Sequence, residues 1–222
     1  MTKNAKISLT LAAVAVVVVA ALLATTGSGS PDGAGRSAAS PQEVSPELLV
    51  RSDSHRLSTA ADGKVTVVEF LDLECEACRA AFPVVERLRE EYAGRVTFVM
   101  RYFPVPSHRN AELAAQAVEA AAAQGKLEPM YRKMYQTQAG WGDQQVSHEK
   151  TFLDFARDLE LDMDTFEQAW KDPATIARVR KDREDGLALG VRGTPTFFVN
   201  NRHVQVGSYE EFKAIIDAEL AR

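Results

Sequence analysis

Val65 to Cys78, V-T-V-V-E-F-L-D-L-E-C-E-A-C, contains both cysteines of the chain and its sharpest change from strand to helix. Val65 to Leu71 is a run rich in β-branched and aromatic residues, long enough for a buried strand and too short for a helix. In the segment that follows, Phe82, Val85 and Leu88 recur at the three-residue spacing of an amphipathic helix. The stretch therefore predicts a buried strand, a turn and a helix that starts at the cysteines.

The two cysteines, Cys75 and Cys78, lie three residues apart in the first turn of the predicted helix. That spacing is close enough to form a disulfide. Unpaired backbone N–H groups and the helix dipole favour negative charge at a helix N-terminus, so the thiolate of Cys75 should be stabilised. Cys78 lies one turn deeper. We predict Cys75 as the attacking sulfur and Cys78 as the resolving one.

The strand, the Cys-x-x-Cys sequence and the helix together resemble the corresponding corner of the thioredoxin superfamily. Glu69 stands six residues before Cys75, where these proteins carry a buried carboxylate. Pro83 stands five residues after Cys78, where they carry a proline that kinks the helix. Gly193-Thr194-Pro195-Thr196-Phe197 resembles the family loop in which a cis proline faces the disulfide.

The distance along the chain between the cysteines and this loop indicates one branch of the superfamily. Cys75 and Pro195 are 120 residues apart, and the chain between them reads mostly as helix. This resembles the DsbA-like branch, in which a helical domain is inserted in a thioredoxin fold. The resemblance implies an α/β fold with a central mixed β-sheet flanked by helices. Residues 46–222 would form the DsbA-like thioredoxin domain, with an inserted helical subdomain at about 107–189.

Hydrophobic spacing, together with Gly and Pro at the breaks, predicts the remaining elements. We expect a strand-like lead-in over Glu47–Leu57, a second central strand over Arg95–Tyr102, and a hairpin over Thr196–Val199 and His203–Val206. Ser208 and Glu211 form a capping-box pattern that opens the last helix. Between His108 and Gly190, helices are expected at Asn110–Gln124, Lys126–Thr137, Ser147–Glu160, Met163–Lys171 and Pro173–Leu189.

The N-terminal residues fit the charged and hydrophobic parts of an export signal. Lys3 and Lys6 precede an apolar run from Leu9 to Ala24, and no clear A-x-A cleavage site follows it. Residues 1–26 are therefore either a cleaved signal or an uncleaved membrane anchor, since the run is near the lower length limit for a spanning helix. Residues 27–45 are rich in Gly, Ser, Ala and Pro and predict a flexible linker. Either alternative places the domain outside the cytoplasm, in the cell envelope or secreted.

Composition and cysteine usage exclude several classes of function. The net charge is −5 and no basic patch stands out, which argues against nucleic-acid binding. A structural zinc site needs four N/S ligands, and the chain has no second cysteine pair and only four histidines, none at finger spacing. A purely structural disulfide usually closes a longer loop than this one. We expect no metal or organic cofactor beyond the redox-active disulfide Cys75–Cys78.

The resemblance assigns roles to individual residues. Glu69 corresponds to the family's buried proton acceptor for the resolving cysteine, the alternative being an edge glutamate that reaches solvent. Pro195 would be cis, and Thr194 would line the loop that binds substrate peptide. Between the cysteines, Glu76 and Ala77 replace the Pro and His of strongly oxidising relatives, at positions that face substrate.

The acidic pair Glu74 and Glu76 should oppose the Cys75 thiolate and make the disulfide less oxidising. His108 and Arg109 are expected at a helix entry, with substrate contact as the alternative. Trp141, between two glycines, is expected at the surface near the binding groove.

The function implied is that of an extracytoplasmic thiol–disulfide oxidoreductase, acting as a disulfide oxidase on cysteines of exported proteins. In the family a membrane partner passes the electrons to quinone and restores the disulfide. We expect a monomer that is held at the membrane by its N-terminal segment. The alternatives are a thiol reductase or isomerase, and a non-catalytic thioredoxin-like module that binds a partner or handles copper.

Overall fold

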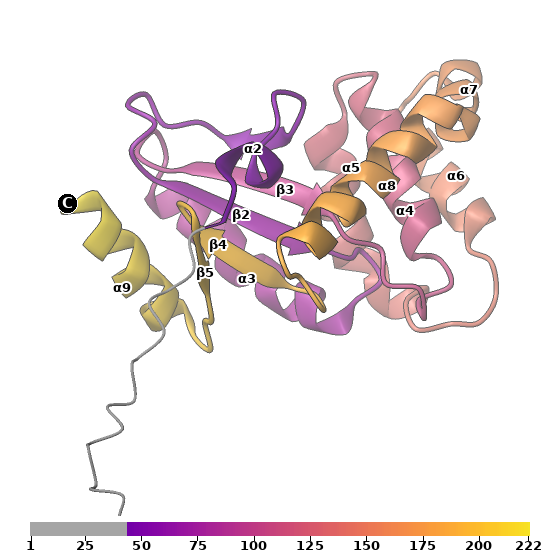
Figure 1. Ribbon diagram of the computed structural model, residues 1–222. Coiled ribbons are helices and arrows are strands. Elements are labelled where there is room, and N and C mark those ends of the chain that lie inside the picture. The colour runs from indigo at the N-terminus through magenta and orange to yellow at the C-terminus, as the bar shows by residue number, and fades with distance from the viewer. Residues whose placement is uncertain (1–43) are drawn as a thin grey trace, which may run out of the picture. The chain divides into compact units, whose positions relative to one another are not determined.

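The computed structural model describes residues 44–222, and within them five strands form one mixed sheet (Figure 1). The strand order is β1-β3-β2-β4-β5; β2 and β3 are parallel, and the other neighbours are antiparallel. Helices flank this sheet, which confirms the predicted α/β thioredoxin fold. The strands are β1 (His55–Ser58), β2 (Thr66–Leu71), β3 (Thr97–Tyr102), β4 (Thr196–Val199) and β5 (Arg202–Val204).

Five of the helices in this part of the chain, α4 to α8, follow one another between β3 and β4, where the helical subdomain is expected (Figure 1). Helix α3 follows β2 directly and carries Pro83 in its interior. The helices are α2 (Pro46–Leu49), α3 (Glu76–Glu91), α4 (Ala111–Ala122), α5 (Leu127–Thr137), α6 (Glu149–Asp158), α7 (Met163–Lys171), α8 (Pro173–Ala188) and α9 (Tyr209–Leu220), with a 3-10 turn at Gln138–Gly140.

The predicted lead-in over Glu47–Leu57 is wrong in its first half, because Pro46–Leu49 forms helix α2 and the strand begins only at His55. Proline is favourable in the first turn of a helix, where its missing N–H costs nothing. Leu49, at the end of α2, is buried in the hydrophobic cluster on one face of the sheet. Tertiary burial therefore fixes a short helix that the sequence pattern alone does not reveal.

The two faces of β2 belong to different hydrophobic clusters. Val67 and Leu71 pack in the larger cluster, which includes residues of α3 and α9. Val68 and Phe70 pack in the smaller cluster on the opposite face. Since successive side chains of a strand point to opposite faces, Glu69 lies on the same face as Val67 and Leu71. The only acidic residue of this strand therefore points toward the α3 side, into the larger core.

A buried arginine ties the helical segment to the sheet. Arg101 on β3 is fully buried, and its guanidinium donates to Asp182 at 2.9 Å and to Asp185 at 2.8 Å, both on α8. The same side chain donates to the carbonyl oxygens of Leu48 and Leu49 in α2, at 2.8 and 2.7 Å. One side chain thus joins β3, α8 and α2. Loss of Arg101 leaves two buried carbonyls without this donor and takes one cation from each carboxylate, although Arg51 still binds both carboxylates.

The predicted signal or anchor, residues 1–26, and the linker as far as residue 43 lie outside the described residues. Within residues 44–222, no helix combines the length and the apolar character needed to cross a membrane.

We predict that Arg101→Met lowers the free energy of unfolding by about 3 kcal/mol, because the buried carbonyls of Leu48 and Leu49 lose a donor and two carboxylates lose one of their cations. Arg180→Met is the matched control. Arg180 on α8 is 62% exposed and pairs at the surface with Glu112 of α4. That control should cost less than about 1 kcal/mol. Urea denaturation of both variants measures the difference; equal losses would contradict a structural role for the buried cluster.

Candidate active site

The turn between β2 and α3 is organised by one buried carboxylate, that of Asp72. One of its oxygens accepts the backbone N–H of Glu74 at 2.8 Å, and the other accepts that of Val105, also at 2.8 Å. The ring Nδ1 of His108 lies 2.7 Å from the second oxygen. The main-chain carbonyl of Asp72 accepts the N–H of Cys75 at 3.1 Å. Asp72 therefore holds the cysteine turn against the segment that follows β3.

The two cysteines are both free thiols and differ in burial. Cys75 is the N-cap residue of α3 and is partly exposed, whereas Cys78 in the first turn is completely buried. The Sγ atom of Cys75 lies 3.4 Å from the carbonyl oxygen of Thr194. The Thr194–Pro195 peptide bond is cis. The structure thus brings the cysteine turn and the proline loop together across a sequence separation of about 120 residues, as the resemblance implies.

The environment of Cys75 favours its thiolate. A hydrogen bond from the Cys78 thiol is the largest cause of the lowering of the pKa of Cys75 to about 5, and partial burial opposes it. A hydrogen bond from Thr194 lowers this pKa further, as do the backbone N–H groups of Ala77 and Cys78. The Thr194 hydroxyl is buried and has no hydrogen-bond partner among the described residues. Cys75 is therefore ionised at neutral pH.

The environment of Cys78 has the opposite effect. Burial raises the pKa of Cys78 well above its ordinary value, and its hydrogen bond to Cys75 and the charge of Glu69 add to the rise. Glu69 is itself buried in the central strand. Burial raises the pKa of Glu69 to about 8, with smaller contributions from the charges of Glu86 and Cys75. At neutral pH the site accordingly holds one thiolate, one thiol and one protonated carboxyl group.

The acidic residues beside the cysteines differ in burial. Glu76 and Ala77 are exposed. Glu74 is buried, and its carboxylate accepts the backbone N–H of Asn110 at 2.6 Å. Their opposition to the Cys75 thiolate stays a prediction, because the largest causes of its lowered pKa are the bonds from Cys78 and Thr194. A pKa of about 5 nevertheless lies between the roughly 3.5 of a strong oxidase and the roughly 7 of thioredoxin.

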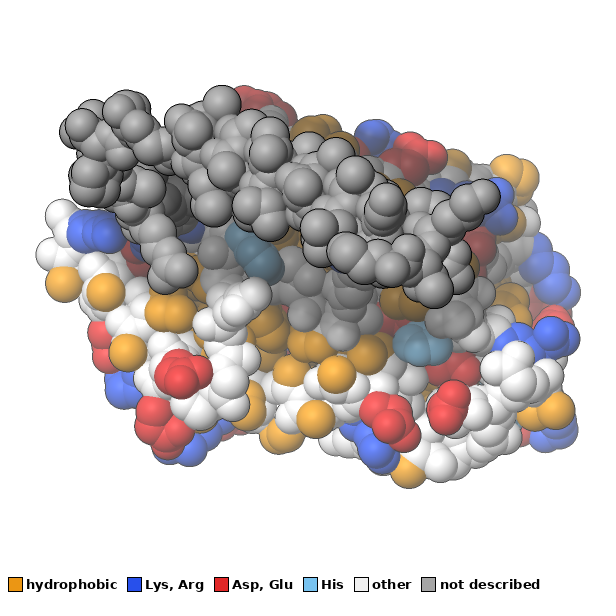
Figure 2. All heavy atoms as spheres, turned by 60° about the horizontal axis from the view of Figure 1, so that its bottom comes forward, with side chains coloured by type: hydrophobic (Ala, Val, Ile, Leu, Met, Phe, Trp, Pro, Cys, Tyr) orange, Lys and Arg blue, Asp and Glu red, His pale blue; other side chains and the backbone are white. Residues whose placement is uncertain are grey.

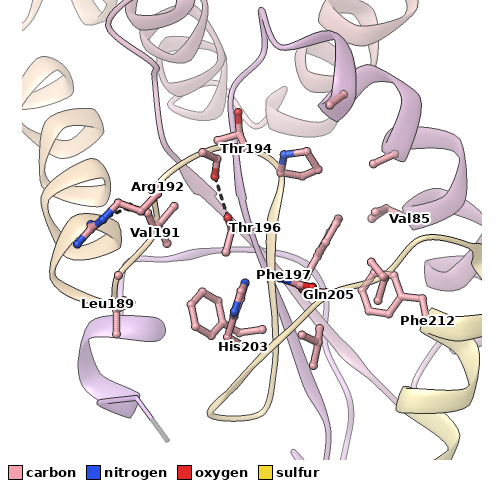
Figure 3. A pocket seen from close by; sticks show the side chains of 18 of the residues that line it. Val85, Leu189, Val191, Arg192, Thr194, Thr196, Phe197, His203, Gln205 and Phe212 are labelled. Atoms are coloured by element: carbon pink, nitrogen blue, oxygen red, sulfur yellow. Dashed lines mark hydrogen bonds between the residues drawn. The ribbon is translucent and has the colours of Figure 1, made fainter. Parts of the chain in front are cut away.

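A pocket of about 1320 Å³ extends from the cysteine turn along the proline loop to the β4–β5 hairpin. Figure 3 shows Val85 and Phe212 on one side of it, Leu189 and Val191 on the other, and Phe197 between them. Figure 2 shows hydrophobic side chains gathered between charged groups on the face below the sheet as Figure 1 draws it. The pocket is mostly apolar and partly open, so it suits an extended or unfolded peptide.

One predicted position is confirmed and one needs correction. His108 and Arg109 lie directly before Asn110, the N-cap residue of α4, as expected of a helix entry, and the His108 ring also binds Asp72. The sequence gives no direct signal for this contact. It forms because β2 and β3 are parallel neighbours, so the segments that follow them meet at one edge of the sheet. Trp141 is not at the surface: it is buried and packs edge-to-face on Phe152.

No group of three or more His, Cys, Asp or Glu side chains in residues 44–222 is arranged to hold a metal ion.

Comparison with known proteins agrees with this geometry. A family model described as Thioredoxin matches residues 56–218. A solved thioredoxin-like oxidoreductase from Silicibacter pomeroyi is 26% identical with a TM-score of 0.68, covering 81% of this chain and 99% of that one. Wolbachia pipientis alpha-DsbA1 is 20% identical with a TM-score of 0.71, covering 80% and 96%. BdbD from Bacillus subtilis is 22% identical with a TM-score of 0.69, covering 82% and 98%.

Some relatives of this chain are longer proteins that are named as Na(+)/H(+) antiporters. The Na(+)/H(+) antiporter NhaA 3 of Salinispora tropica is 35% identical over 159 residues, which are 70% of this chain and 23% of that protein. The NhaA antiporter of Herminiimonas arsenicoxydans is 33% identical over 149 residues, 67% of this chain and 22% of that protein. The chain thus spans less than a quarter of the length of these relatives.

The chain belongs to the thioredoxin family. Within that family, its fold, with helices α4 to α8 between β3 and β4, is similar to that of the solved DsbA-type structures.

We predict that Glu69→Gln changes the pH dependence of stability in the reduced protein. The pKa of Glu69 is raised to about 8 in the folded state from an ordinary value of 4.5. Between these values the unfolded chain loses the proton and the folded chain keeps it, so stability falls as pH rises. This slope is at most about 1.4 kcal/mol per pH unit, and the variant should lack it.

Urea denaturation at pH 5, 6.5 and 8 measures the effect, and Glu90→Gln is the control because Glu90 is exposed on α3. Parallel pH profiles for wild type and Glu69→Gln would show that the carboxyl group ionises freely in the folded protein.

Proposed function

We propose that this protein exchanges its Cys75–Cys78 disulfide with cysteine pairs of exported proteins outside the cytoplasm, in the direction of disulfide oxidation. The observation that carries the proposal is the contrast between the two sulfurs. Cys75 is partly exposed and its pKa is lowered to about 5, whereas Cys78 is buried and its pKa is raised. A nucleophilic, accessible sulfur next to a protected one is the arrangement that controlled thiol–disulfide exchange needs.

The first step starts from the oxidised protein. A substrate thiolate attacks Sγ of Cys75, a sulfur–sulfur bond forms between them, and the Cys75–Cys78 bond breaks. Cys78 leaves as a thiolate in a buried position where a negative charge is unfavourable. The protonated carboxyl group of Glu69 supplies a proton to it, and the same group takes that proton back when Cys78 attacks in the reverse direction.

The second step releases the product. A second substrate thiolate attacks the substrate sulfur of the mixed disulfide, the substrate disulfide forms, and Cys75 leaves as a thiolate. Because the pKa of Cys75 is about 5, this sulfur is a good leaving group at neutral pH. Two electrons pass from the substrate dithiol to the protein, which ends in the reduced form.

The neighbouring loop and pocket support a peptide as the substrate. Thr194 and Pro195 line the pocket, and the carbonyl oxygen of Thr194 lies 3.4 Å from Sγ of Cys75, so a chain bound along this loop comes close to the reactive sulfur. In this proposal Glu76 and Ala77, exposed between the cysteines, also face the bound chain. A mostly apolar lining selects unfolded segments by hydrophobicity more than by sequence, with Arg192 as its charged group.

Location and partners follow from the N-terminal sequence and the family. The lysines and apolar run before residue 26 are those of an exported protein, with the segment either cleaved or kept as an anchor. The reduced protein needs an oxidant, and we assign this role to a membrane partner that passes electrons to quinone. The protein acts as a monomer with no cofactor beyond its disulfide. The antiporter activity in the names of the longer relatives belongs to proteins of which this chain matches less than a quarter.

We predict that reduced Cys78→Ala forms a stable mixed disulfide with scrambled, disulfide-containing ribonuclease A. Cys75 attacks a substrate disulfide and one substrate sulfur leaves; without Cys78, no resolving sulfur attacks Cys75 to release the bound substrate. Non-reducing electrophoresis of the purified full chain measures the adduct. Cys75→Ala is the matched control and should give almost none, because the remaining sulfur is buried and un-ionised. Absence of the adduct, or equal adducts from both variants, would favour a non-catalytic module.

A further inference from the structure

The histidine that strongly oxidising relatives carry between their cysteines is absent here, and Glu76-Ala77 stands in its place. A different histidine reaches the site from another part of the chain. His108 follows β3, and its Nδ1 lies 2.7 Å from a carboxylate oxygen of Asp72. The main-chain carbonyl of that same Asp72 holds the N–H of Cys75 at 3.1 Å. One residue thus links the imidazole ring to the cysteine that reacts.

The ring is held by one bond to Asp72, and the backbone that carries it is held as well. Its own backbone N–H bonds to the carbonyl oxygen of Val105 at 3.0 Å, and the N–H of Val105 bonds to Asp72 at 2.8 Å. Because an ionised carboxylate only accepts, Nδ1 donates its proton to Asp72. The His108 side chain is 27% exposed, so its other nitrogen is not enclosed by the core.

The charged and titratable groups that face the ring are Asp72, Glu74 and Cys75. Burial alone would lower the pKa of His108, but the hydrogen bond and charge of Asp72 raise it above its ordinary value, and the charges of Cys75 and Glu74 add to the rise. Burial raises the pKa of Asp72, while its bonds from Val105, Glu74 and His108 act against that rise.

We propose that His108, held in place by Asp72, supplies the positive charge that stabilises the Cys75 thiolate in the reduced protein. This rests on the function proposed above, and it gives the chain a replacement for the missing histidine between the cysteines. Asp72 is a positioning residue in this arrangement, since it acts through His108 and through the cysteine turn.

The interaction must be reciprocal. If a protonated His108 favours the Cys75 thiolate, the thiolate favours protonation of His108 to the same extent. In the disulfide form Cys75 carries no charge, so the effect on His108 disappears. Reduction therefore draws a fraction of a proton to His108 near its pKa, and the reduced form loses this support as pH rises through that value.

We predict that His108→Gln lowers the ionisation constant of Cys75 about three- to tenfold, the size expected for one charge near a partly exposed site. Titration of thiolate absorbance in the purified full chain measures it. Arg109→Gln is the matched control, because it removes a neighbouring positive charge that is exposed and has no bond to Asp72. It should change the constant less than twofold. An equal constant in wild type and His108→Gln would overturn the inference.

A second measurement needs no variant. NMR titration of the His108 ring in oxidised and reduced wild type should give a higher pKa in the reduced form, by the same factor that the variant reveals. Identical His108 titrations in the two redox states would refute the interaction. A wild-type Cys75 that titrates near its ordinary pKa would instead refute the activated cysteine on which the proposed function rests, so the two failures are distinguishable.

Discussion

The buried carboxylate of Asp72 is the interaction on which the rest of the site depends. It lies where the central strand β2 ends, and its bonds reach the cysteine turn, the segment after β3 and the ring of His108. A carboxylate in the core is costly unless its lone pairs are satisfied. Here the three donors that satisfy it are the groups that must be held near Cys75. The cost of burying the charge therefore fixes the geometry of the dithiol.

The chemistry of the site comes from a difference in solvation across one helical turn. Cys75 at the start of α3 receives backbone and side-chain donors, while Cys78 and Glu69 lie in the core and resist ionisation. The stabilised thiolate exists only in the reduced protein. Its stabilisation therefore favours reduction and makes the disulfide a better oxidant. The raised pKa of Glu69 keeps a proton within the core, where the leaving sulfur needs one.

Local patterns were enough for the fold and for part of the site. The strand before Cys75, the helix after it and the final capped helix are all visible in short stretches of sequence, because spacing and capping act over a few residues. The cis proline loop was found through family resemblance. Contacts between distant segments were not visible: Asp72 and His108 are 36 residues apart and meet only because β2 and β3 are parallel neighbours.

The same limit applies to individual side chains. The sequence does not show that the carboxylate of Glu74 is buried and accepts the N–H of Asn110. Trp141 between glycines looks exposed, yet it packs against Phe152 from α6. In both, a tertiary partner decides the direction of a side chain, and no periodicity in the chain records that partner.

The most direct test of the central claim, that the stabilised Cys75 thiolate makes this protein a disulfide donor, is the reduction potential of the Cys75–Cys78 pair. Equilibration of the full chain with glutathione gives this value. We predict a potential of roughly −120 to −180 mV, in the oxidising range of such pairs. A potential near roughly −250 mV or lower would place the protein with reductases and contradict the proposed direction of electron flow.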